Sequence, residues 1–226
     1  MRLVWCTGLP GAGKSTLCLL LAGSPVFAQD ADEDGFAGRR WRRGRGTGRV
    51  PDDVALDWTT QEWALDVARV AALRDLPHEV GVLFGVVGNE REARHLFDAV
   101  AFLDATPATL VHRLRTRTGN DYGKRPDELD DVLRWAKGAR RLHERRGDLI
   151  IPNDAGPEQA LERLLELCDD LVPGQDRKVG SPSTQVASTR ASCTDSGGPD
   201  STSRSSRTTS AGLPGARTPR SSSNAW

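Results

Sequence analysis

The sequence predicts an α/β fold in which a parallel sheet is covered by helices on both faces. Three observations lead to this prediction. Short apolar runs alternate with segments of helical periodicity, one run is apolar on both faces, and a glycine-rich turn joins the first run to a helix. A strand that is buried on both faces belongs inside a parallel sheet. Alternating strands and helices are joined by right-handed crossovers, so we expect three layers.

Five short apolar runs are the expected strands of this sheet. They lie at residues 3–6, 25–28, 80–87, 100–103 and 149–151. Segments with helical spacing of apolar residues lie at 17–21, 57–76, 90–97, 107–117, 126–146 and 157–171. Thr106 and Pro107 supply an N-cap and a first-turn proline. Residues 17–21 are expected on the buried side of their helix, and residues 30–50 are expected to be irregular.

The apolar sides of two longer helices follow from their spacing. Trp63 and Val67, with Val70 and Leu73, predict the helix at 57–76, which Pro77 closes. The expected apolar side of the helix at 126–146 consists of Leu129, Leu133, Ala136 and Leu142.

The turn between the first strand and the first helix carries a phosphate-binding pattern. It reads Gly-Leu-Pro-Gly-Ala-Gly-Lys-Ser-Thr, which is G-x-x-x-x-G-K-[ST]. Its glycines let backbone N–H groups point into one concavity at a helix N-terminus, where an anion is favoured. Lys14 adds charge for the β- and γ-phosphates, and the Ser15 hydroxyl is placed to bind Mg²⁺. The predicted donor-phosphate site is Gly8, Leu9, Pro10, Gly11, Ala12, Gly13, Lys14, Ser15 and Thr16.

Two carboxylates follow the second strand. Asp30 and Asp32 alternate in an extended segment, so both side chains point toward the carboxyl ends of the strands, where such sheets bind ligands. Asp30 would hold Mg²⁺ through water, and Asp32 would take the proton of an acceptor hydroxyl. The alternative is a solvated acidic turn that includes Glu33 and Asp34.

Two arginine-rich segments extend this picture. Arg113 and Arg117 are four residues apart in the helix before a Gly-containing loop, so they share a face and would close over the polyphosphate. The alternative is a solvated helix face. The stretch 39–45 contains five arginines and Trp41. It would suit an anionic acceptor with a ring that stacks on Trp41, or it would be a flexible basic loop.

Composition divides the chain into two parts. Residues 173–226 are rich in Ser, Thr, Gly, Pro and Arg, which predicts a disordered tail and leaves 1–172 as one domain. The tail holds seven of the 31 basic and three of the 31 acidic residues, so the domain has a net charge of −4. A mildly acidic domain is not typical of a general nucleic-acid binder.

Cysteine usage and hydropathy bear on the compartment. The four cysteines show neither metal spacing nor a paired pattern. No apolar stretch approaches membrane-spanning length, and the N-terminus runs directly into a strand without a signal peptide. We expect a soluble cytoplasmic protein that has no membrane partner.

These motifs resemble those of the small P-loop kinases, a group of P-loop NTPases that includes shikimate-kinase-like, gluconate-kinase-like and adenylate-kinase-like enzymes. The resemblance rests on residues 8–16, the Asp30-x-Asp32 pair, the Arg113-x-x-x-Arg117 pair and the strand–helix order, and it covers most of residues 1–171. It implies a three-layer sandwich with five parallel strands in the order 2-3-1-4-5. It also implies a lid at about 118–126 and an acceptor-binding region at about 30–60.

The resemblance also implies cofactors and roles. The cofactors are ATP and Mg²⁺, with Ser15 and Asp30 at the metal. Lys14, Asp32, Arg113 and Arg117 would be the catalytic residues, and the two arginines would also contact the donor nucleotide. The segment 151–155 looks like the turn that contacts adenine, which assigns Asn153 to the nucleotide site.

The segment after the third predicted strand departs from these groups. Residues 85–89 read Gly-Val-Val-Gly-Asn, without the three glycines of shikimate kinases or the Asp-Gly-x-Pro-Arg of nucleoside monophosphate kinases. No aspartate of the Walker-B type ends the strand at 80–87, which argues against a motor ATPase.

The sequence therefore predicts a kinase that moves the γ-phosphoryl group of ATP to a small-molecule hydroxyl or a nucleotide-like acceptor. Two alternatives stay open. One is a nucleotide-binding regulatory switch with little kinase activity, and the other is a kinase of nucleic-acid ends. The acceptor, the choice between ATP and GTP, the oligomeric state and the role of the tail are not encoded in these motifs.

Overall fold

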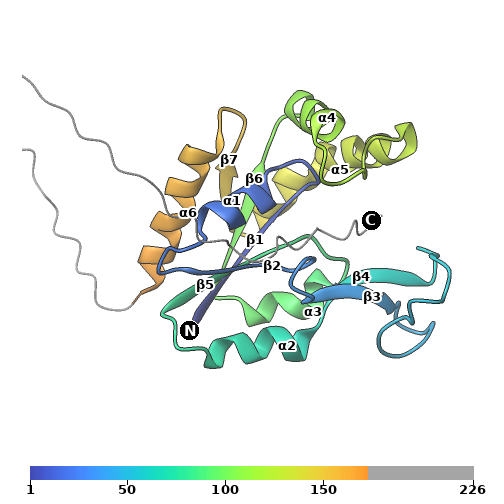
Figure 1. Ribbon diagram of the computed structural model, residues 1–226, viewed down its shortest axis with the longest axis horizontal. Helices are drawn as coiled ribbons and strands as arrows, with labels where there is room; N and C mark the ends of the chain where they lie inside the picture. The colour runs from blue at the N-terminus through green and yellow to red at the C-terminus, as the bar shows by residue number, and fades with distance from the viewer. Residues whose placement is uncertain (173–226) are drawn as a thin grey trace, which may run out of the picture. The chain divides into compact units, whose positions relative to one another are not determined.

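The computed structural model describes residues 1–172. The predicted tail at 173–226 lies outside the described residues. Figure 1 shows the arrangement of the helices and strands in the described part.

A five-stranded parallel sheet forms the centre of the fold. Its strands are β1 (Arg2–Gly8), β2 (Phe27–Asp30), β5 (Val80–Phe84), β6 (Ala99–Asp104) and β7 (Leu149–Pro152). Their spatial order is β2-β5-β1-β6-β7, and each neighbouring pair is parallel. Counted along the chain within this sheet, the order is second, third, first, fourth, fifth. The predicted α/β class and strand order are confirmed.

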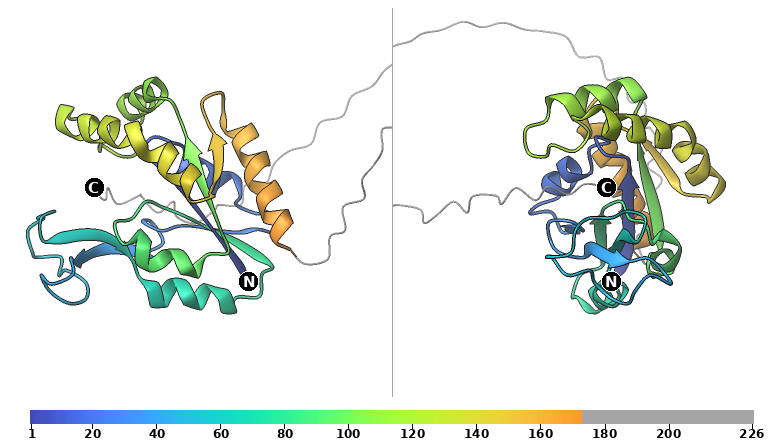
Figure 2. Two further views of the ribbon diagram at one scale, coloured as in Figure 1. Left: turned by 180° about the vertical axis from the view of Figure 1, so that it is seen from behind. Right: turned by 90° about the vertical axis from the view of Figure 1, so that its right-hand side faces the viewer.

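Helices cover both faces of the sheet, as two views in Figure 2 also show. One core joins β1, β5 and β6 to the helices α1 (Lys14–Leu20), α4 (Pro107–Thr116), α5 (Pro126–Arg145) and α6 (Pro157–Leu171). The other core joins the opposite face to α2 (Val67–Ala72), α3 (Glu90–Ala93) and the 3₁₀ turns at Leu73–Asp75 and Arg94–Leu96. Central strand β1 is buried from Leu3 to Gly8, which explains its continuous apolar sequence.

A two-stranded hairpin corrects the largest error of the sequence prediction. Strands β3 (Ala37–Trp41) and β4 (Gln61–Leu65) pair antiparallel. The hairpin projects away from the main sheet (Figures 1 and 2). The helix predicted at 57–76 is therefore wrong in its first half, and the irregular segment predicted at 30–50 contains a strand. Asp66 separates strand from helix because its side chain accepts a hydrogen bond from Arg69 N and caps α2.

Smaller differences concern element ends and exposed faces. The apolar run at 80–87 leaves the sheet after Phe84, and the predicted strand at 25–28 begins at Phe27. Residues 17–21 are not all buried, because Leu17 and Leu21 point inward while Leu19 is 75% exposed. Leu142 of α5 is also exposed, and its neighbour His143 is buried against Phe102 instead. A helix exposes some of five consecutive residues by geometry, whatever their hydropathy.

The remaining helix ends agree with the expectation. The Thr106 side chain accepts from Thr109 N, and Pro107 begins α4. Pro126 and Pro157 begin α5 and α6. Among residues 1–172, no helix is both long enough and apolar enough to cross a membrane.

Candidate functional site

The glycine-rich turn after β1 forms a cradle in which two positions have backbone angles that favour glycine. Gly11 and Gly13 have φ values of 87° and 106°, in the left-handed region. A Cβ on Gly13 would lie 2.4 Å from Asn153 Nδ2. The turn therefore needs glycine at position 13 both for its dihedral angles and for the close approach of a second loop.

Lys14 lies beneath this cradle and points back along it. Its Nζ donates to Gly8 O at 2.7 Å and to Leu9 O at 3.3 Å. Burial lowers the pKa of Lys14, and the charges of Asp32 and Asp30 oppose that change. A cation that has lost water and is held by carbonyl oxygens gains most from a phosphate placed beside it.

Ser15 and Asp30 meet at the start of α1. Ser15 Oγ donates to Asp30 Oδ2 at 3.0 Å, and Asp30 Oδ1 accepts from Asp32 N at 3.1 Å. Mg²⁺ prefers oxygen ligands, and a hydroxyl next to one carboxylate beside a phosphate cradle is the donor set that it uses with nucleotides. The residues present therefore fit the predicted metal.

Asp32 is half-buried beside the hairpin. Burial raises the pKa of Asp32 to about 6, while a hydrogen bond from Trp63 Nε1 to Asp32 Oδ1 at 2.7 Å opposes this rise. A carboxylate with a pKa near neutral is suited to accept and release a proton.

Arg113 and Arg117 reach the cradle from α4 and its C-terminal end. Arg113 Nη1 lies 3.4 Å from Gly11 O and 3.3 Å from Ala12 O. Arg117 Nη2 donates to Tyr122 O at 2.5 Å and to Asn120 Oδ1 at 3.4 Å, so the loop after α4 holds this side chain. Burial lowers the pKa of Arg117, and the charge of Asp121 opposes it.

These side chains line one cavity with a volume of about 450 Å³. It is lined by Pro10, Gly11, Gly13, Lys14, Ser15, Thr16, Asp30, Asp32, Arg113, Thr116, Arg117 and Asn120. The structure thus brings together all the predicted catalytic and metal-binding residues. Thr116 and Asn120 were missed by sequence reasoning, although their places beside Arg117 and Gly119 were a usable signal.

A family model matches the part of the chain that carries this cavity. Residues 4–135 match the family model described as "AAA domain". The chain belongs to the AAA-domain family. The matched range includes the phosphate loop, both aspartates and both arginines.

Three solved structures are similar to this AAA-domain protein. TT1252 from Thermus thermophilus is 17% identical, with a TM-score of 0.47, and the match covers 76% of this chain and 98% of that chain. Shikimate kinase from Bacteroides thetaiotaomicron is 22% identical, with a TM-score of 0.48 and coverages of 74% and 98%. A gluconokinase from Sinorhizobium meliloti 1021 is 17% identical, with a TM-score of 0.43 and coverages of 75% and 95%. The sequence has no match among curated proteins.

Asn153 has a different place in this AAA-domain protein from the other predicted site residues. It is 2% exposed, and its Nδ2 donates to Ala12 O at 2.7 Å while its backbone N donates to Asp104 O at 2.7 Å. It lies behind the phosphate loop and supports its backbone. It does not line the cavity, so a contact between Asn153 and a nucleotide base stays a prediction.

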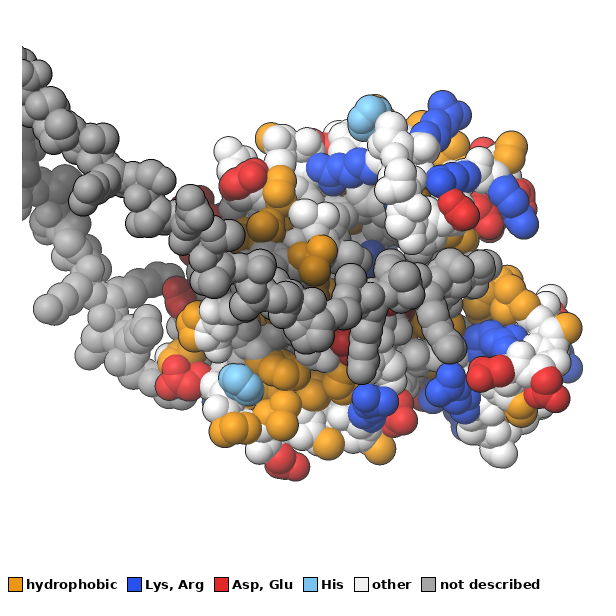
Figure 3. Space-filling view, viewed as in Figure 1, with side chains coloured by type: hydrophobic (Ala, Val, Ile, Leu, Met, Phe, Trp, Pro, Cys, Tyr) orange, Lys and Arg blue, Asp and Glu red, His pale blue; other side chains and the backbone are white. Residues whose placement is uncertain are grey.

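The arginines of 39–45 are largely engaged in contacts within the protein. Arg39 donates to Val54 O at 2.8 Å, and Arg40 forms ion pairs with Glu62 and Glu92. Basic and acidic side chains lie side by side over the hairpin in Figure 3.

Trp41 is half-buried, and its ring packs against Gly46. A Cβ on Gly46 would lie 2.5 Å from the Trp41 ring, so this glycine packs directly against the indole. The contacts of Arg39, Arg40 and Trp41 favour a structural hairpin over an open anion site.

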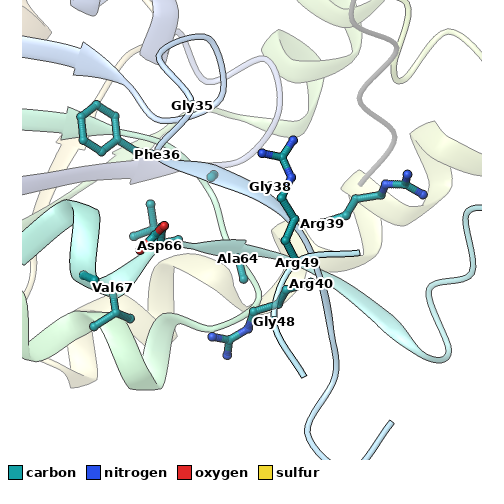
Figure 4. A pocket seen from close by; sticks show the side chains of 13 residues that line it. Gly35, Phe36, Gly38, Arg39, Arg40, Gly48, Arg49, Ala64, Asp66 and Val67 are labelled. Atoms are coloured by element: carbon teal, nitrogen blue, oxygen red, sulfur yellow. The ribbon is translucent and has the colours of Figure 1, made fainter. Parts of the chain in front are cut away.

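A second hollow lies between the hairpin and the start of α2 (Figure 4). Its volume is about 330 Å³, and its lining includes Gly38, Arg40, Arg49 and Asp66. It shares no lining residue with the cavity at the phosphate loop. The chemistry-bearing groups therefore gather at the phosphate loop, which we take as the candidate site.

Proposed function

We propose that this AAA-domain protein is a kinase that transfers the γ-phosphoryl group of ATP to the hydroxyl of a small molecule or a nucleotide-like acceptor. The observation that carries the proposal is the presence, in one cavity, of a phosphate cradle and of the half-buried Asp32 carboxylate, whose pKa is raised to about 6. A nucleotide-binding protein that only senses its ligand has no need for a second, base-like carboxylate beside the phosphates.

Different residues of the cavity have different roles in the proposed phosphoryl transfer. Backbone N–H groups of the cradle and the Lys14 ammonium bind the donor phosphates, and Arg113 and Arg117 neutralise charge from the other side. Ser15 and Asp30 would hold Mg²⁺, which neutralises phosphate charge when bound. Asp32 takes the proton of the acceptor hydroxyl. Positioning and charge supply most of the rate because this reaction needs little covalent chemistry from the protein.

The direct test is a screen of hydroxylated metabolites and nucleotides for acceptor-dependent conversion of ATP to ADP, with Lys14→Ala as the inactive comparison. We expect Lys14→Ala to lower turnover by at least about 100-fold, because a preorganised charge at the phosphates is worth several kcal/mol. Its melting temperature should not fall, because the variant removes a desolvated charge.

Lys137→Ala is the matched control, since this lysine is exposed on α5. Full turnover in Lys14→Ala would refute the assignment.

One observation favours a nucleotide-binding switch as the second candidate. The segment after β5 is occupied by structural contacts: Gly85 O accepts from Trp5 Nε1, Gly88 N donates to Trp63 O, and the Asn89 side chain binds Leu65. In a switch, ATP would bind tightly with no acceptor-dependent turnover, and the same screen distinguishes the two functions. The hairpin arginines Arg39 and Arg40 are engaged by groups within the protein, which argues against a kinase of nucleic-acid ends.

A further inference from the structure

Trp63 contacts the carboxylate to which we assign the role of base. Its indole Nε1 donates to Asp32 Oδ1 at 2.7 Å. Asp32 follows β2 at the edge of the sheet, whereas Trp63 belongs to β4 of the hairpin, 31 positions further along the chain. Helical spacing predicts Trp63 as a core residue, so its contact with the site is a product of the tertiary structure.

The backbone around Trp63 is held against the segment that follows β5. Gly88 N donates to Trp63 O at 2.6 Å. Two residues further on, Leu65 N donates to Asn89 Oδ1 at 2.8 Å and Asn89 Nδ2 donates to Leu65 O at 3.1 Å. Asn89 is 5% exposed, so these bonds are shielded from water. These hydrogen bonds therefore fix the backbone position from which the Trp63 indole extends.

The hydrogen bond distinguishes the two oxygens of the Asp32 carboxylate. Oδ1 accepts from the indole, whereas Oδ2 receives no hydrogen bond from any residue in the described part of the chain. On the other side, Asp32 N donates to Asp30 Oδ1, and Asp30 Oδ2 accepts from Ser15. A continuous chain of contacts thus runs from the phosphate loop through both aspartates to the hairpin.

We propose that Trp63 is a positioning residue, whose indole N–H holds Asp32 by Oδ1 so that Oδ2 is the oxygen that takes the acceptor proton. The inference rests on the proposed function of Asp32. In the step, the hydroxyl proton moves to Oδ2 and the hydroxyl oxygen bonds to the γ-phosphorus. The bond from the γ-phosphorus to its bridging oxygen breaks, and ADP leaves. A carboxylate free to rotate would present the correct oxygen for only part of the time.

The hydrogen bond between Trp63 and Asp32 can be tested without measuring activity. In a ¹⁵N-tryptophan-labelled full-length protein, Trp63→Phe identifies the Trp63 indole N–H resonance. We expect that N–H to exchange slowly with solvent in the wild-type protein and at least about tenfold faster in Asp32→Ala, because its acceptor is gone. Equal exchange in both proteins would show that the hydrogen bond is absent and would overturn the proposal.

The functional role is tested with MgATP and water as the phosphoryl acceptor, under single-turnover conditions with enzyme in excess. We expect Trp63→Phe to slow phosphate release by between about tenfold and a hundredfold. The dissociation constant of MgATP should change less than about twofold, because Trp63 does not line the phosphate cradle. Trp135→Phe is the matched control, since that indole lies 40% exposed on α5.

The outcomes separate the two proposals. If Asp32→Asn hydrolyses MgATP at the wild-type rate, the assignment of Asp32 as base fails, and the positioning role falls with it. If Asp32→Asn is slow while Trp63→Phe equals the wild type, the base stands and the positioning role of Trp63 is overturned. A loss of MgATP affinity in Trp63→Phe as large as its loss of rate would also overturn it, because that result indicates general damage to the site.

Discussion

At the scale of single residues, Asp32 is held in an environment that is unfavourable to its charge. Burial raises its pKa from 3.8 to about 6. The folded protein therefore binds a proton on Asp32 more tightly than the unfolded chain does, and stability falls as pH rises between these two values. A carboxylate whose pKa is raised by burial is common where protons must be exchanged near neutral pH.

Asp32→Asn is therefore expected to stabilise the protein while it removes activity. At pH 7 the gain in unfolding free energy should be up to about 3 kcal/mol, which is the cost of keeping the half-buried carboxylate charged. Below pH 4 the wild-type carboxyl is itself protonated, so the difference should vanish. Urea unfolding at pH 7 and pH 3.5 measures both values. A variant that is less stable than the wild type at pH 7 would contradict the pKa assigned to Asp32.

Gly13 provides a second residue-scale prediction. Gly13→Ala places a Cβ in a left-handed backbone and 2.4 Å from Asn153 Nδ2. Gly23→Ala is the matched control, because Gly23 has φ 84° and a Cβ added there would meet no atom within 4 Å. The control should lose about 1 kcal/mol from backbone strain alone.

We expect Gly13→Ala to lose at least about 2 kcal/mol more than this control, since the loop supported by Asn153 must move. Thermal unfolding and MgATP binding measure the difference. Equal losses in the two variants would mean that the Asn153 contact is not close.

At the scale of elements, one buried amide side chain holds the hairpin to the sheet. Asn89 pairs with both the N–H and the C=O of Leu65, much as a third strand would. These bonds take the place of a regular ladder where β4 approaches the segment after β5.

Asn89→Ala should therefore cost about 2–4 kcal/mol, because it leaves two buried backbone groups without partners. It should also speed hydrogen exchange at Leu65 before it affects β1, since the hairpin opens separately from the sheet. Hydrogen exchange followed by mass spectrometry resolves the two regions. Gln159→Ala, at an exposed position of α6, serves as the control. Uniform exchange across hairpin and sheet would contradict the role of Asn89.

At the scale of the whole molecule, the described residues form one parallel sheet and a hairpin whose Trp63 contacts the site through Asp32. The apolar runs and the glycine-rich turn determine by themselves that β1 leads into a phosphate cradle, because both depend on local backbone preferences. They also place Asp30 and Arg113 near that cradle, since carboxyl ends of parallel strands share one edge of a sheet.

Only the tertiary structure decides the partners of the remaining side chains. Residues 61–65 lie in a segment, 57–76, that has helical spacing of apolar residues, yet they form a strand because they pair with 37–41. Trp63 therefore reaches Asp32 instead of a helix core, and Arg40 meets Glu62 and Glu92 instead of an anionic acceptor. Strand pairing between residues that are far apart in the chain leaves no periodic pattern in a single sequence. The pairing brings the Trp63 indole to Asp32, whereas the local motif alone determines the phosphate cradle.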